Sequence, residues 1–198
     1  MAIQIDRAIF LHIPKTGGTW ITNYFKETNM DHGDGQLGLH AHINGKVIRA
    51  MKDPIDDVVF CFVRHPLTWY RSYWQMKKDL VSKRHGGWID TIVDQPFHDF
   101  IKTVIEMEPG YLTSFFEGYT ERSRLIGKQE SLREDLDDIL RLLSIKYDRH
   151  HLFEKPKENS QAPYATYSHR LAKLLMDSEK DLITKYNYNY IPDGVLDV

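Results

Sequence analysis

Cysteine is nearly absent from this sequence, in which Cys61 is the single cysteine among 198 residues. One cysteine excludes an intrachain disulfide and any metal site built of cysteine ligands alone. The sequence also lacks an apolar run near the ~20 residues that a membrane-spanning helix requires. Its N-terminus has no cationic segment followed by an apolar stretch, which is the pattern of a secretory signal. We therefore expect a cytoplasmic protein that does not span a membrane.

An excess of charge of either sign is missing as well. Lys and Arg number 26 against 28 Asp and Glu, a net charge of −2 at pH 7. A protein that binds nucleic acid by general phosphate attraction is expected to be strongly basic, so we expect no nucleic-acid partner. The apolar fraction of 41% is sufficient for a core, and the length predicts one domain over residues 1–198. Histidine, with 10 residues, is the one residue type in evident excess.

Two almost wholly apolar segments, residues 8–13 and 58–63, predict strands that are buried on both faces. A helix is expected from Gly18 or Thr19 after the first, and from Pro66 after the second, where proline suits the first helical turn. Buried strands that alternate with helices predict an α/β protein, with three α/β/α layers around a central parallel sheet. The remaining predicted elements are strands at 46–48 and 124–127, helices at 97–105, 168–176 and 178–186, a helix opened by a capping box at 131–134, and an irregular loop at 155–168.

Ligands of such sheets bind beyond the carboxyl ends of the strands. Two segments are expected to lie at that edge, HIPKTGGTW (residues 12–20) and Arg64-His65-Pro66. Gly17 and Gly18 allow the backbone to approach an anion closely, and the helix that begins there presents unpaired N–H groups. Lys15 adds a positive charge, and two threonines add hydroxyl donors. The segment predicts a phosphate site, and the alternative is a plain strand-to-helix turn that is capped by a threonine.

The common nucleotide fingerprints are missing. The nucleoside-triphosphatase loop places its lysine after the glycines, whereas Lys15 precedes them, and no G-x-G-x-x-G is present. The strand at 58–63 leads directly into Arg64 rather than into an aspartate that would bind magnesium. We therefore expect a site in which the protein, and not a metal ion, neutralises the phosphate charge.

HIPKTGGTW, followed by VVFCFVRHPLTWYRSYW (residues 58–74), resembles the sulfotransferases that use 3′-phosphoadenosine 5′-phosphosulfate (PAPS). The nearest pattern is that of the carbohydrate type that acts on the 2-O position of heparan sulfate. Looser likenesses occur at residues 126–136, around Asn159 and Ser160, and in the C-terminal YNYNY. The resemblance implies the sulfotransferase fold, which is similar to that of the P-loop nucleoside triphosphatases. It also implies transfer of a sulfonate group to a hydroxyl acceptor, with adenosine 3′,5′-bisphosphate (PAP) as the product.

The same resemblance implies residue roles. Lys15 would contact the bridging and sulfonate oxygens, and Arg64 and Ser72 would bind the 3′-phosphate of the nucleotide. The residues that would hold the 5′-phosphate end are Thr16, Gly17, Gly18, Thr19 and Trp20.

A general base is needed to remove the acceptor proton, and His40-Ala41-His42 is the first candidate. The 2-O enzymes carry a similar His-x-His between the same two blocks, with the second histidine as base. This implies His42, with His40 as a helper or substitute. In an extended segment the two histidines lie on one side. The alternatives are a metal-binding pair, a structural role, or a carboxylate base such as Glu27 or Glu117.

Two other classes of function remain open: a kinase with an atypical phosphate loop, and an inactive nucleotide-binding scaffold. The acceptor is open too, with sugar, phenol, lipid and peptide hydroxyls all possible. Lys77, Lys78, Lys83 and Arg84 are candidates for binding an anionic acceptor, although they equally fit a solvated helix face. Lys155 and Lys157 are candidates for a loop over the nucleotide, and His12 is expected to support the phosphate loop.

Overall fold

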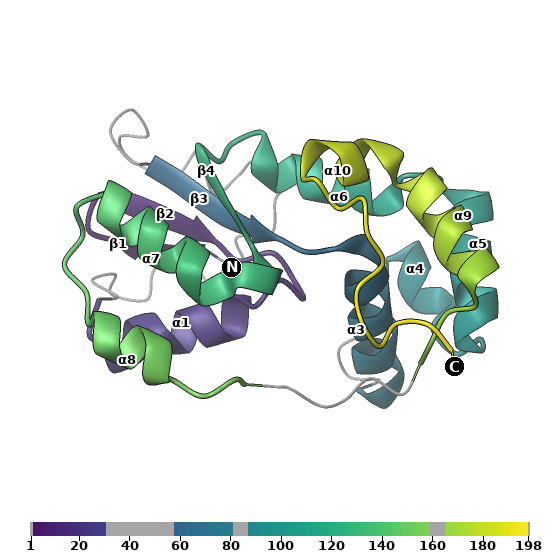
Figure 1. The fold of residues 1–198 in the computed structure, drawn as a ribbon, viewed down its shortest axis with the longest axis horizontal. Helices are drawn as coiled ribbons and strands as arrows, with labels where there is room; N and C mark the ends of the chain where they lie inside the picture. Colours follow the sequence, from purple (N-terminus) through teal and green to yellow (C-terminus); the bar gives the residue numbers. More distant parts are fainter. Residues whose placement is uncertain (1, 31–57, 81–86, 159–164, 198) are drawn as a thin grey trace. The chain divides into compact units, whose positions relative to one another are not determined.

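A computed structural model describes residues 2–30, 58–80, 87–158 and 165–197 (Figure 1). The chain divides into two compact units, which are treated separately below. The first comprises Met1–Arg64 with Phe116–Ser160, and the second comprises His65–Phe115 with Gln161–Val198. The expectation of one domain over the whole chain stays a prediction.

The first unit is built on a four-stranded sheet in the order β1 (Ala2–Ile5), β2 (Ala8–Leu11), β3 (Val58–Val63), β4 (Leu125–Lys128). Strands β2, β3 and β4 are parallel, so the prediction of an α/β protein with a mostly parallel sheet is confirmed. A wholly parallel sheet is wrong, because β1 pairs with β2 in the antiparallel direction. Two residues connect these strands, a length that permits a hairpin but not the long crossover of a parallel pair.

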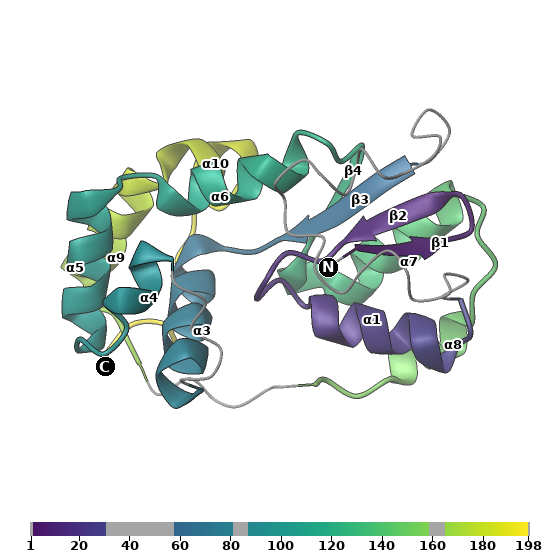
Figure 2. The ribbon, with the colours of Figure 1, turned by 180° about the vertical axis from the view of Figure 1, so that it is seen from behind.

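One face of this sheet is covered by α1 (Gly18–Glu27), α7 (Leu132–Leu142) and α8 (Arg149–Glu154), as Figures 1 and 2 show for α1 and α7 from opposite sides. Aromatic rings fill the space between the layers, with the ring centroids of Phe10 and Phe60 5.3 Å apart. The cluster further includes the buried residues Ile3, Ile5, Phe62, Trp20, Ile21, Tyr24, Phe25, Leu136, Ile139, Leu140 and Leu152.

The predicted elements of this unit occur with small changes. Strand β3 and the start of α1 at Gly18 are confirmed. Strand β2 ends at Leu11, two residues before the end of the apolar run. The Ile13 carbonyl accepts a hydrogen bond from the Thr16 hydroxyl in the turn that follows. The capping box is wrong: α7 begins at Leu132, but Ser131 makes no side-chain cap bond and ends a short 3₁₀ helix, η2 (Gln129–Ser131). Strand β1 and helix α8 were not predicted.

The second unit is helical in its described part. A buried carboxylate, Glu179, organises it: the Tyr70 hydroxyl donates to it at 2.7 Å, and the Thr113 hydroxyl at 2.7 Å. The N–H groups of Leu112 and Thr113 donate to it as well, which satisfies donors that the start of a helix leaves unpaired. The helices are α3 (Pro66–Asp79), α4 (Trp88–Thr91), α5 (Phe97–Met107), α9 (His169–Ser178), α10 (Lys180–Lys185) and the beginning of α6 (Tyr111–Thr120), whose later part lies in the first unit.

A second buried polar group in this unit corrects an expectation. Lys77 is 5% exposed, and its Nζ lies 3.0 Å from a carboxylate oxygen of Asp90. The Tyr73 hydroxyl donates to the other oxygen of Asp90 at 2.6 Å. Lys77 is therefore part of the interior and is not exposed to an anionic acceptor. Lys78 lies over the ring of Trp74, with its Nζ 4.5 Å from the ring centroid, whereas Lys83 and Arg84 lie outside the described residues.

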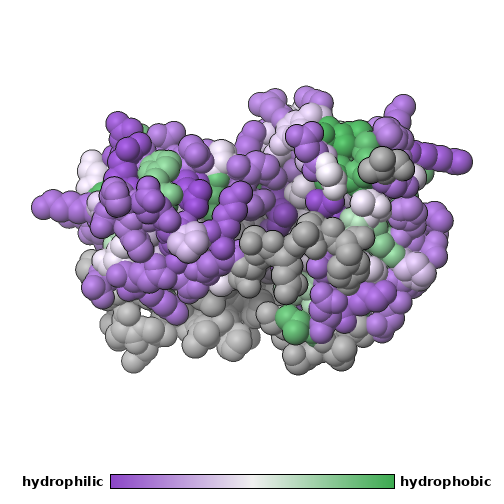
Figure 3. Space-filling model, turned by 60° about the horizontal axis from the view of Figure 1, so that its bottom comes forward, coloured by the Kyte–Doolittle hydropathy of each residue, from purple (hydrophilic) through white to green (hydrophobic). Residues whose placement is uncertain are grey.

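The surface is mainly hydrophilic on the face drawn in Figure 3, with small separate hydrophobic patches. No helix within the described ranges combines the length and apolar character that crossing a bilayer requires. The large hydrophobic side chains with substantial exposure are Leu80, Met107, Leu142, Leu174, Tyr190 and Ile191.

Asp137 on α7 gives the first unit a pH-dependent contact. Its carboxylate is buried and accepts hydrogen bonds from the Tyr147 hydroxyl and from Nε of Arg149, the latter at 2.9 Å. Burial alone would raise the pKa of Asp137, but these donors outweigh it and hold the pKa below its usual value. Burial and the Asp137 carboxylate together raise the pKa of Tyr147 to about 12.

We predict that Asp137→Asn lowers the free energy of unfolding at pH 7 by about 1–3 kcal/mol, because the Tyr147 hydroxyl and the Arg149 guanidinium lose a charged acceptor that is itself buried. A lowered folded-state pKa stabilises the protein above the unfolded-state pKa, and the stabilisation disappears as pH falls through the folded-state value. The difference from wild type should therefore shrink at pH 3. Urea unfolding at both pH values measures it, with exposed Asp138→Asn as the control. A pH-independent difference would contradict the assignment.

Candidate phosphate site

The loop between β2 and α1 has a backbone conformation that is typical of anion-binding loops. The angle φ is positive at Lys15 (68°) and at Gly17 (87°) but not at the intervening Thr16. Alternation of this kind turns successive N–H groups toward one side, where they form a concavity that binds anions. The first turn of α1 continues the loop and holds no acidic residue, so nothing there opposes the positive end of the helix dipole.

Thr16 supports the loop from inside. It is fully buried, and its hydroxyl donates to the Ile13 carbonyl at 2.9 Å. A hydroxyl has one proton to donate, so Thr16 would reach a phosphate through its backbone N–H rather than through its side chain. Thr19, in the first turn of α1, is exposed and fits the hydroxyl role that was expected of it.

Gly18 is required by His12. A Cβ atom at position 18 would lie 2.0 Å from Cδ2 of the His12 ring, much closer than two carbons can approach. The ring also stacks on Phe10, with an interplanar angle of 12°. Burial lowers the pKa of His12 to about 4, so the ring is neutral at pH 7. His12 thus packs under the start of α1, as expected of a supporting residue.

Arg64 brings the second motif to the same loop. Its Nη1 donates to the Lys15 carbonyl at 3.0 Å, across 49 residues of sequence. The parallel register pairs Leu11 with Cys61, so the segments that follow β2 and β3 leave the sheet at one edge. The prediction that the Lys15 and Arg64 motifs meet at the carboxyl ends of the strands is confirmed.

Lys128 lies at this edge as well, and the sequence analysis did not single it out. It is the last residue of β4 and pairs in register with Val63, the residue before Arg64. Its backbone N–H donates to Asp135 at 2.6 Å. Three neighbouring parallel strands are therefore each followed or ended by a basic residue. The feature that could have identified Lys128 from the sequence is its position at the end of a strand.

The other predicted residues include Ser72, His40, His42 and Glu117. Ser72 lies on α3 in the second unit and is half-buried, so its expected role beside Arg64 stays a prediction. His40 and His42 lie outside the described residues. Within the described part, no group of His, Cys, Asp or Glu side chains could hold a metal ion. Glu117 is exposed on α6.

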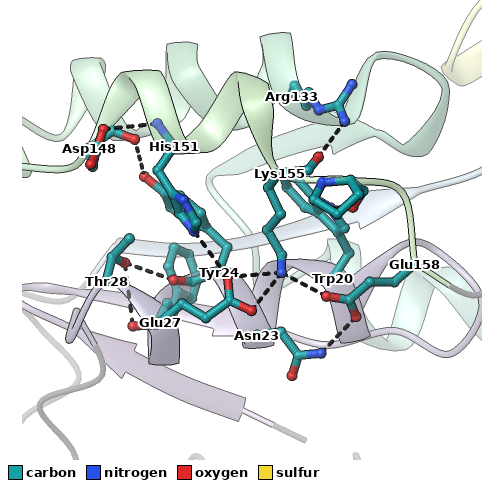
Figure 4. A network of polar contacts seen from close by, with 12 residues as sticks. Trp20, Asn23, Tyr24, Glu27, Thr28, Arg133, Asp148, His151, Lys155 and Glu158 are labelled. Carbon is teal, nitrogen blue, oxygen red and sulfur yellow. Dashed lines mark hydrogen bonds and ion pairs between the residues drawn. The ribbon is translucent and has the colours of Figure 1, made fainter.

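Trp20 has a structural side chain. It is 5% exposed, stacks on Tyr24 and donates its indole N–H to the Pro156 carbonyl at 2.8 Å. The ring therefore fixes the segment after α8 to α1 (Figure 4). A contact of Trp20 with the 5′-phosphate would have to involve its backbone N–H in the first turn of the helix.

Glu27 is engaged at the other end of α1. Lys155 Nζ lies 2.8 and 2.9 Å from its two carboxylate oxygens, and His151 Nε2 lies 3.0 Å from one of them (Figure 4). The hydrogen bond from Lys155 is the main cause that lowers the pKa of Glu27. The helix rise of ~1.5 Å per residue places Glu27 roughly 14 Å along the axis from Gly18. Its position and lowered basicity both argue against Glu27 as general base.

Lys155 is likewise engaged in ion pairs. It is 5% exposed, and its Nζ contacts Glu158 at 2.7 Å in addition to Glu27. Burial alone would lower the pKa of Lys155, but the hydrogen bonds to Glu158 and Glu27 outweigh it, so the pKa is raised. Lys155 therefore holds its segment to α1, and its candidate role in a loop over the nucleotide stays a prediction.

We predict that Gly18→Ala destabilises the protein by roughly 1–3 kcal/mol, because the new methyl group overlaps the His12 ring. In a His12→Ala background the same substitution should cost much less, or even stabilise, since alanine favours a helix over glycine by ~1 kcal/mol. Urea unfolding of the four proteins of this double-mutant cycle measures the coupling. An equal cost of Gly18→Ala in both backgrounds would show that the contact does not matter.

Neither a protein-family model nor a curated protein sequence matches this chain. The site is therefore interpreted from its geometry and from the resemblance of its two motifs.

Proposed function

We propose that the protein is a sulfotransferase that moves a sulfonate group from PAPS to a hydroxyl acceptor. The proposal includes the three-layer α/β/α sulfotransferase fold, of which the mostly parallel sheet and its helical layer are the observed part. The observation that supports it most is the hydrogen bond from Arg64 to Lys15, which joins the two motifs on which the resemblance depends.

The residues present fit the donor chemically. PAPS carries negative charge at a 5′-phosphosulfate and at a 3′-phosphate, and the resemblance assigns one motif to each. The loop from Lys15 to Gly18 offers converging N–H groups at the start of α1. Arginine, with its planar fork of donors, is the usual partner of a phosphate group. Lys128 adds positive charge at the same edge.

In the proposed mechanism the acceptor oxygen attacks sulfur in line while His42 takes the acceptor proton. The new bond joins the acceptor oxygen to sulfur, and the bond from sulfur to the bridging oxygen of the 5′-phosphate breaks, which leaves PAP. Lys15 and the N–H groups of α1 stabilise the charge that develops on the departing phosphate, as preorganised donors do in other group transfers.

Calorimetry with PAP, and separately with ATP and magnesium, tests the ligand class. We expect PAP to bind, and Lys15→Met to weaken its binding tenfold or more because a charged hydrogen-bond donor is lost. Exposed Lys146 provides the control: Lys146→Met makes the same charge change on a distant surface and should leave the affinity unaltered. Tight binding of ATP without binding of PAP would favour the kinase alternative.

His42→Ala tests the base. We expect the variant to bind PAP like the wild type but to lose transfer by roughly 10²–10⁴-fold, the usual contribution of a placed base. Transfer is measured with labelled PAPS and an acceptor selected from sugar, phenol, lipid and peptide panels. Transfer at the wild-type rate would shift the assignment to His40 or Glu117.

A further inference from the structure

We propose that Arg64 is a positioning residue for the Lys15 loop. Binding of the 5′ end of the nucleotide then depends on Arg64, in addition to binding of the 3′-phosphate. This inference deepens the proposed function and rests on it. The resemblance assigns to Arg64 a contact with the 3′-phosphate alone. The structure gives its Nη1 a different partner, the carbonyl oxygen of Lys15 at 3.0 Å.

The backbone at Lys15 needs such support. Its φ of 68° lies in the left-handed region, where the Cβ of an L-residue crowds the following carbonyl. A conformation of this kind persists where surrounding contacts determine it. The neighbouring residues are both fixed: Thr16 is bonded to Ile13, and Gly17 packs so closely on Leu132 that a Cβ there would lie 2.9 Å from its methyl carbon. Arg64 adds the contact to the strained residue itself.

The carbonyl of Lys15 belongs to the same peptide unit as the N–H of Thr16. In a planar trans peptide the C=O and N–H bonds point in opposite directions, and the described residues include no cis peptide. By binding the carbonyl on one side, Arg64 directs the Thr16 N–H to the other. That N–H is the group through which Thr16 would reach the 5′-phosphate, because its hydroxyl is bonded inside the loop.

The position of Arg64 in the chain makes it a rigid support for the Lys15 loop. It directly follows β3, an interior strand of the sheet with parallel partners on both sides. Its backbone position is therefore set by two strand registers, and the guanidinium reaches the loop from a fixed base.

Two nucleotides can distinguish binding of the 3′-phosphate by Arg64 from positioning of the loop by Arg64. PAP carries a 3′-phosphate and a 5′-phosphate, whereas adenosine 5′-monophosphate (AMP) carries the 5′-phosphate alone. If Arg64 only binds the 3′-phosphate, its loss weakens PAP and leaves AMP unchanged. If Arg64 positions the loop, its loss weakens AMP too. Ser72→Ala is the matched control, since Ser72 is expected at the 3′-phosphate and lies on α3 of the second unit, whereas the loop belongs to the first unit.

The experiment measures both affinities by calorimetry for wild type, Arg64→Ala, Arg64→Lys and Ser72→Ala. We expect Arg64→Ala to weaken AMP binding roughly tenfold, Arg64→Lys to weaken it less because an ammonium group can still donate to a carbonyl, and Ser72→Ala to weaken PAP only. AMP affinities within twofold of wild type in both Arg64 variants would overturn the inference. Arg64→Lys serves if Arg64→Ala does not fold.

A ligand-independent measurement keeps the two proposals distinguishable. We expect the backbone amide resonance of Thr16 in the nucleotide-free protein to shift in Arg64→Ala but not in Ser72→Ala. Wild-type protein that binds neither PAP nor AMP would refute the proposed function, while the shifted amide would still support the positioning role. An unshifted amide overturns that role whatever the nucleotides do.

Discussion

The site depends on the parallel pairing of β2 with β3. Parallel strands end at the same edge of a sheet, so the two segments that follow them leave the sheet together, although 49 residues separate Lys15 from Arg64. The pairing of Val63 with Lys128 extends the same edge to a third strand. A shift of β3 by one residue would turn its side chains to the opposite face and displace Arg64 from the Lys15 carbonyl.

Two glycines of the first unit pack closely against the rings of neighbouring side chains. Gly18 allows the start of α1 to lie on the His12 ring, and Gly127 allows β4 to pass the ring of Phe62, where a Cβ would lie 2.4 Å from a ring carbon. Both glycines lie in elements whose ends form the site. The absence of a side chain at these two glycines therefore allows α1 and β4 to lie close to the rings that they contact.

The sequence predicts most of the features that depend on local patterns, and the capping box at 131–134 is the exception. The apolar run at 58–63, the helix start at Gly18 and the proline at position 66 all agree with the structure. The charge pairs between side chains of separate elements were not predictable. A lysine is usually exposed to solvent, but Lys77 is buried in an ion pair with Asp90. A glutamate can act as a general base, but the Glu27 carboxylate is bound by Lys155. Charge pairing across separate elements has no signature in local sequence.

Backbone strain distinguishes Lys15 from the other residues that share its conformation. Within the described ranges five residues other than glycine have positive φ: Asp6, Lys15, Asn29, Ser144 and Asn187. Asp6 lies in the β1–β2 turn, and the other three follow α1, α7 and α10, where a left-handed residue commonly ends a helix. The next N–H in each of these three cases bonds back to the last helical turn, as from Met30 to Phe25. Lys15 precedes a helix instead.

A helix start imposes no left-handed residue, so local structure does not account for the strain at Lys15. The strained φ of Lys15 forms an alternation with Gly17, and in a backbone of this kind successive N–H groups form an anion-binding concavity. An observed outlier with no structural requirement is a sound basis for inferring function. The strained residue is here also the charged one, and Arg64 of the second motif binds its carbonyl. Conformation, charge and support thus coincide at a single peptide, which is the physical reason why we propose that the anion binds there.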